Sequence, residues 1–147
     1  MTATGHAILG TVIAAKIGNP ALALPIAIAS HFVADAFPHW DTATNIRRKG
    51  KKRVMIEAFL DVTMGFIISY LILQFLSPQT NYSYAILIVL AAQLPDWLTA
   101  PYYFFKIAFF KKAYTLQKIF DNKLNKPWDI INQIAVLALI VILVKIF

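Results

Sequence analysis

The sequence predicts an all-α fold, a polytopic membrane bundle of about five helices, and three observations lead to this expectation. The composition is too apolar for a soluble domain, several apolar segments could cross a bilayer, and basic residues gather in two loops. Hydrophobic residues occupy 59% of the 147 positions and charged residues only 14%, with a mean hydropathy of +0.64. No linker-like segment interrupts the chain, so we expect one integral membrane domain over residues 1–147.

The first two apolar runs, residues 4–17 and 20–37, are predicted to form a helical hairpin. Gly18, Asn19 and Pro20 separate them as a helix stop followed by a proline start. Both runs are rich in alanine and glycine, the small residues that let membrane helices approach closely.

Three later segments are long enough to cross a hydrocarbon core of about 30 Å, and each is expected to be a helix. They cover residues 54–76, 82–105 and 128–147. Residues 106–125 mix lysines with large apolar side chains, a pattern typical of a helix on the cytoplasmic membrane surface. An ordinary solvated helix is an equally good interpretation of that segment.

The basic residues predict the orientation. Residues 47–53 hold six basic residues and no acid, and residues 106–126 hold six lysines against one aspartate. Both segments are therefore expected on the cytoplasmic side, with residues 77–81 outside. Nucleic-acid binding is a weaker explanation of the net charge of +7, because the basic residues concentrate where membrane orientation requires them.

The ionisable residues that could carry chemistry fall near the cytoplasmic ends of the predicted helices. His31 and Asp35 are four residues apart, as are Glu57 and Asp61, so each pair shares one helix face. Pro38 either kinks the second helix or ends it, which would leave His39 and Asp41 in a turn. The full candidate set is His6, His31, Asp35, His39, Asp41, Glu57, Asp61 and Asp96.

Five carboxylates at membrane depth would repel each other unless they were protonated or neutralised, so we expect a divalent-metal site with two or more ions. The chain has no cysteine, and imidazole with carboxylate favours Zn²⁺, with Mn²⁺ and Fe²⁺ as alternatives. The expected metal ligands are His6, His31, Asp35, His39, Glu57 and Asp61, and the expected catalytic residues are Asp41 and Asp96. Glu57 and Asp61 could instead pair with Arg53 or Lys52.

At these residues the chain resembles the bacterial and archaeal family of membrane-bound metal-dependent hydrolases. The resemblance rests on Gly5 and His6, on SHFVADAFPHWD from Ser30 to Asp41, and on LPDW from Leu94 to Trp97. It implies a prokaryotic membrane location and metal ligation at the matching histidines and aspartates. The PDxDH and HxxxH stretches of larger members are absent in that form. A weaker similarity, in HxxxD spacing, is to zinc-dependent phospholipase C and related nucleases.

The expected function is hydrolysis of a phosphate-bearing lipid or amphiphile at the cytoplasmic leaflet, with anionic membrane lipids as partners collected by the basic loops. The alternative is a non-catalytic protein, either stabilised by its metal or acting as a metal or proton carrier. The few polar residues in the outer halves of the helices argue against transport by a monomer, but they leave transport by a homo-oligomer open.

Overall fold

The computed structural model describes residues 1–123 and 127–147, and within these residues the chain is helical and contains no β-strand. In chain order the elements are α1 (Ala3–Lys16), α2 (Pro20–Ala36), α3 (Ile46–Lys49), α4 (Lys51–Leu76), α5 (Tyr82–Phe105), the 3₁₀ turn η1 (Ala108–Phe110), α6 (Lys111–Phe120) and α7 (Pro127–Ile146). The all-α prediction is confirmed.

Three helices are long and apolar enough to cross a membrane, namely α4, α5 and the Trp128–Ile146 part of α7. The predicted hairpin forms α1 and α2, but these have 14 and 17 residues and are about 21 and 25 Å long. Both are shorter than a hydrocarbon core of about 30 Å, so the structure shows three candidate spans where the sequence predicted five.

Local sequence signals define the hairpin. The Thr2 side chain accepts a hydrogen bond from the Gly5 amide at the start of α1, and Asn19 caps α2 one residue before Pro20. α2 ends at Ala36, two residues before Pro38. Of the two outcomes considered for Pro38, the helix stops, and His39 lies in the loop that follows.

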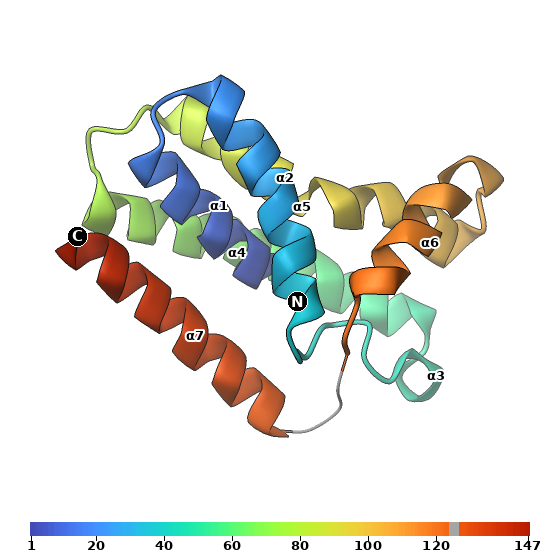
Figure 1. Ribbon diagram of the computed structural model, residues 1–147. Coiled ribbons are helices and arrows are strands. Elements are labelled where there is room, and N and C mark those ends of the chain that lie inside the picture. The colour runs from blue at the N-terminus through green and yellow to red at the C-terminus, as the bar shows by residue number, and fades with distance from the viewer. Residues whose placement is uncertain (124–126) are drawn as a thin grey trace.

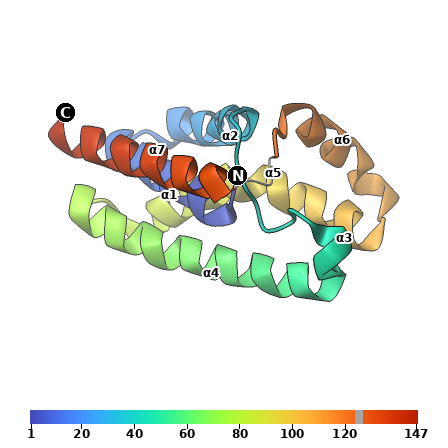
Figure 2. The ribbon, with the colours of Figure 1, turned by 90° about the horizontal axis from the view of Figure 1, so that it is seen from below.

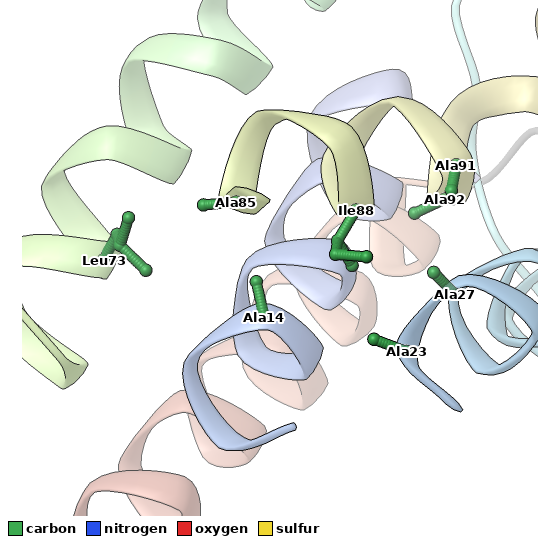
Figure 3. Packing of buried hydrophobic residues seen from close by; sticks show 8 residues of the cluster. All are labelled: Ala14, Ala23, Ala27, Leu73, Ala85, Ile88, Ala91 and Ala92. Carbon is green, nitrogen blue, oxygen red and sulfur yellow. The ribbon is translucent and has the colours of Figure 1, made fainter. Parts of the chain in front are cut away.

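α1 lies at the centre of the bundle, against α4 on one side and α5 on the other, while α2 packs on α5 (Figure 1). Small residues permit this close packing: a Cβ atom on Gly10 would lie 2.9 Å from Val89 Cα of α5. The core cluster consists mostly of alanines, and Figure 3 shows Ala14, Ala23, Ala27, Leu73, Ala85, Ile88, Ala91 and Ala92.

The two ends of the molecule differ. α4 and α5 extend past the α1–α2 hairpin, and α3 and α6 lie at that end, while the C-terminus of α7 lies at the other (Figures 1 and 2). α7 packs on α1 and α4, and most of its large apolar side chains remain exposed. The predicted surface helix over residues 106–125 is shorter than expected, since it comprises η1 and α6 and ends at Phe120.

Candidate metal centre

Three helices bring ionisable side chains to one buried place. His6 lies in the first turns of α1, His31 and Asp35 in the last turns of α2, and Asp96 in α5. The histidines are fully buried and Asp35 is 1% exposed, whereas the Asp96 side chain is 35% exposed. Asp96 therefore connects a buried cluster with the surface.

His6, His31 and Asp96 form the first group that could hold a metal ion, because one ligand atom from each lies within 4.8 Å of the others. The two imidazole rings stack with centroids 3.8 Å apart and planes 18° apart. Both Nε2 atoms face the same carboxylate, at 3.9 Å for His6 and 3.8 Å for His31.

Asp35 lies between this group and a second one. Its Oδ1 is 3.2 Å from His6 Nε2 and 3.8 Å from His39 Nε2, and its Oδ2 is 3.3 Å from His31 Nε2. The amino group of Met1 also contacts Oδ1. Asp35 therefore contacts histidines of both groups.

The second group is His39, Asp41 and Asp121, again with ligand atoms within 4.8 Å of one another. Backbone pairing carries Asp121 there, since the Asn122 amide donates to the Asp35 carbonyl at 2.9 Å and the His39 amide to the Asn122 carbonyl at 3.3 Å. Asp121 Oδ1 then lies 3.4 Å from His39 Nε2.

Lys123 brings a positive charge to the second group. Its Nζ lies 2.6 Å from Asp41 Oδ2 and 2.9 Å from Asp121 Oδ2. Burial acts to lower the pKa of Lys123, but the two carboxylates outweigh it and hold that pKa above its usual value. Burial likewise acts to raise the pKa of Asp121, while His39 and Lys123 keep it below its usual value. Asp121 is therefore ionised at neutral pH.

The tautomers of two histidines follow from their partners. His31 Nδ1 lies 2.8 Å from the Ala92 carbonyl oxygen, and His39 Nδ1 lies 2.8 Å from the Phe37 carbonyl oxygen. A carbonyl oxygen can only accept, so Nδ1 carries the proton and Nε2 of each neutral imidazole presents a lone pair. This is the orientation in which metal-ligating histidines are commonly held by the protein around them.

The Nε2 lone pairs face carboxylate oxygens, which are also acceptors, and the one donor at His31 Nε2 among the described residues is the Gln117 amide nitrogen at 3.3 Å. Two acceptors at 3.3–3.4 Å repel each other unless a proton or a metal ion lies between them. Within the described chain, several buried atoms of the two groups have no hydrogen-bond partner, namely both His6 ring nitrogens, His39 Nε2 and Asp121 Oδ1, and the same holds for Oε1 of the neighbouring Gln117. A bound cation would satisfy atoms that are otherwise costly to bury.

The structure does not bring Glu57 and Asp61, two of the expected ligands, into either group. Glu57 lies nearer the basic residues of α3 and α4, where its Oε2 accepts from Lys49 at 2.7 Å and its Oε1 accepts from Arg53 at 2.9 Å. Asp61 accepts from the Ala3 and Thr4 amides at the start of α1. For Glu57, the structure therefore agrees with the alternative of pairing with a basic neighbour.

Two residues of the centre were not among the expected ligands. Asp121 is the single acid of the lysine-rich segment, and that isolation is the one signal that could have identified it. Gln117 of α6 is buried, and its Nε2 donates to Asp96 Oδ1 and, at 3.4 Å, to Asp35 Oδ2. A neutral glutamine carries no charge signal, so only the docking of α6 reveals it.

The described residues of the two groups carry an excess of two negative charges, which one divalent ion would neutralise. Four carboxylates are present (Asp35, Asp41, Asp96, Asp121), and Lys123 is the paired side-chain cation. Even with the Met1 amino group counted, four negative charges meet two positive ones while the histidines are neutral. With Glu57 and Asp61 engaged elsewhere, the five-carboxylate argument for two or more ions becomes weaker.

A cleft of about 580 Å³ opens beside both groups, a volume typical of small-molecule sites. α4, α5, α6 and the loop after α2 form its walls. Asp41, Asp96 and Asp121 line it together with Gln117 and Lys123. A molecule in the cleft could therefore reach the carboxylates of both groups.

Comparison of the chain with protein family models, with curated proteins and with solved structures finds no match.

Proposed function

We propose that this protein is a divalent-metal-dependent membrane hydrolase acting on a phosphate-bearing lipid or amphiphile at the cytoplasmic leaflet. One observation carries the proposal: His31 and His39 are each held by a backbone carbonyl at Nδ1 and turn Nε2 toward carboxylates, beside an open cleft. That donor set suits Zn²⁺, Mn²⁺ or Fe²⁺.

The residues of the centre divide into holding and reacting roles. His6, His31 and Asp35 are buried and would hold an ion, with His39 and Asp121 available for a second one. An ion bound there would polarise a phosphoryl oxygen and lower the pKa of a bound water.

Of His6, His31 and Asp96, only Asp96 lines the cleft. Its carboxylate can therefore accept a proton from an attacking water. Asp41 forms an ion pair with Lys123 and would position the ammonium group of that lysine. The ammonium lines the cleft, where it can bind a phosphate oxygen of the substrate.

The depth of the centre suits a headgroup substrate. Asp96 lies about 21 Å from the N-terminal end of α5 and about 14 Å from its C-terminal end, so the centre is nearer the end that carries the basic segments. Each lysine or arginine near an anionic surface contributes about 1 kcal/mol of attraction, which would concentrate acidic headgroups there.

The alternative is a non-catalytic role in which the ion joins the helices, or in which the protein carries metal ions or protons. The burial of His6, His31 and Asp35 supports the first version, because an ion among them would connect α1 to α2 without needing access to substrate. The open cleft at Asp96 favours catalysis over this alternative.

The test is release of phosphate or headgroup from a panel of phosphomonoester, phosphodiester and acyl-ester lipids in proteoliposomes. We expect wild-type activity that chelation removes and Zn²⁺ or Mn²⁺ restores, loss of turnover in His31→Ala, and retained turnover in the matched Glu57→Gln variant. Metal-loaded wild type that releases nothing above His31→Ala across the whole panel would reject the hydrolase proposal and leave the non-catalytic role.

A further inference from the structure

We propose that the cleft between α4, α5 and α6 is a binding site for the hydrocarbon chain of a membrane phospholipid, entered sideways from the bilayer. This inference deepens the proposed function, and it rests on that function for the statement that the bound lipid is the substrate. The chain site itself can be tested without turnover, because its aromatic walls lie beyond the carboxylates of the two groups.

The walls of the cleft beyond the carboxylates are aromatic. α5 contributes Trp97, Tyr103, Phe104 and Phe105, α4 contributes Phe59, and α6 contributes Tyr114. From Asp96 to Phe105 these residues follow about 14 Å of α5, so the cleft has one polar end and one elongated apolar part. An amphiphile likewise has a polar headgroup at one end and an elongated apolar chain.

The mouth of the cleft is continuous with the lipid-facing surface of two candidate spans. Phe59 is 71% exposed and Trp97 is 46% exposed, yet both line the cleft. Their exposed neighbours on the same helices are also large and apolar, for example Leu60 at 55% and Leu98 at 40%. A lipid chain could therefore enter without crossing water.

The surface of α6 suits the membrane interface on this side. The helix buries Gln117 against the carboxylates and exposes Leu116 at 52% and Ile119 at 73%, but also Lys111 and Lys112. A short helix that exposes large apolar side chains together with lysines is typical of the boundary where acyl chains meet anionic headgroups. We take this mixed surface beside the cleft as the reason to assign the cleft to a lipid and not to a second protein chain.

The polar end selects the headgroup. Lys123 lines the cleft there and lies within 2.9 Å of two carboxylates. Four acids in the centre would repel a phosphate in the absence of a cation. We therefore expect chain binding with or without metal, and preference for an anionic phosphate headgroup only when divalent metal is present.

Photocrosslinking tests the proposal. The probe is phosphatidic acid with a diazirine in its acyl chain, added at trace levels to phosphatidylcholine nanodiscs that contain the full-length protein, with and without EDTA. Mass spectrometry should place saturable crosslinks in residues 54–62 and 97–105, and unlabelled phosphatidic acid should compete for them. Ala58→Trp and Ala100→Trp add bulk to the cleft and should reduce these crosslinks at least fivefold.

Ala135→Trp on the exposed part of α7 is the matched control and should leave the labelling unchanged. Thermal midpoints and gel filtration identify misfolded variants, while the crosslink positions in wild type decide the question without any variant. Even labelling of all lipid-facing helices, crosslinks that do not compete, or an apolar mouth covered by a second copy in crosslinked dimers would overturn the proposal. Saturable labelling without hydrolysis would reject the hydrolase proposal and keep the chain site. Hydrolysis without saturable labelling would reject only the chain site.

Discussion

Asp61 shows how a carboxylate inside the bundle can serve the fold without binding an ion. Its Oδ2 accepts from the Ala3 amide at 2.7 Å, and its Oδ1 accepts from the Thr4 amide at 3.1 Å and the Thr4 hydroxyl at 2.7 Å. These donors lie in the first turn of α1, where amides have no partner within the helix. Asp61 therefore ties α4 to the start of α1 and complements the positive end of its dipole.

We predict that Asp61→Ala lowers the free energy of unfolding by about 1–3 kcal/mol, because it leaves these donors without their acceptor. Metal content should not change, since Asp61 belongs to neither metal group. Thermal unfolding in detergent measures the first effect and elemental analysis the second. Asp61→Asn, which keeps one acceptor oxygen, is the control and should cost less. If Asp61→Ala lost as much metal as Asp35→Asn, Asp61 would be a ligand after all.

The residues of the centre differ in how far sequence alone could assign them. The four-residue spacing of His31 and Asp35 requires a shared helix face, and both side chains do approach the same group. Glu57 and Asp61 have the same spacing, yet Glu57 pairs with Lys49 of α3 and Asp61 with the start of α1. Spacing gives the face of a helix, whereas the choice of partner depends on tertiary packing.

At the scale of the elements, Gly10 determines how closely α1 and α5 approach. A Cβ atom there would lie 2.9 Å from Val89 Cα and 3.0 Å from Ala92 Cβ, and the first of these is backbone that cannot move alone. The Ala92 carbonyl also accepts the Nδ1 proton of His31. Packing at Gly10 is thereby coupled to the orientation of a candidate ligand.

Gly10→Ala is expected to lower stability by about 1–3 kcal/mol through overpacking, and to weaken metal binding by displacing the Ala92 carbonyl. Gly18→Ala is the matched control, because a Cβ atom at Gly18 meets nothing within 4 Å. Thermal midpoints and zinc titrations of both variants make the comparison. Equal behaviour of the two variants would show that α1 and α5 are not packed as closely as described.

Helix positions were predictable to within a few residues, because proline, glycine, asparagine and hydropathy mark them locally. α5 begins and ends at the predicted residues, and α2 stops one residue earlier than expected. The docking of α6 was not predictable, since no local pattern marks Gln117 as buried or pairs the Tyr114 and Phe120 rings with α5 and α2. The pairing of Asn122 with Asp35 is equally hidden from local patterns, because it joins segments 87 residues apart.

At the scale of the whole molecule, the basic segments and the candidate metal centre lie toward the same end of the bundle. α3 and the first turn of α4 carry the basic residues 47–53, and α6 lies at that end as well (Figure 1). The sequence predicted this from the lysine and arginine distribution alone. The five predicted crossings are not confirmed, because α1 and α2 are shorter than a hydrocarbon core of about 30 Å and would span it only with thinning of the bilayer.

Cysteine labelling checks the orientation, and the chain is suited to it because it contains no cysteine. We expect Gln79→Cys to react with an impermeant maleimide in intact cells and Arg48→Cys to react only after permeabilisation, since both side chains are exposed but at opposite ends of α4. The reverse pattern would place the basic segments and the metal centre on the outer side of the membrane.

The central claim is that the buried histidines and aspartates hold a divalent ion, and elemental analysis of detergent-purified protein tests it most directly. We predict at least one divalent transition-metal ion per chain in wild type, loss of that ion in Asp35→Asn, and full retention in Glu57→Gln, whose carboxylate pairs with Lys49 and Arg53. Wild type that contains no stoichiometric metal after purification and reloading would contradict the claim, as would equal metal loss in the two variants.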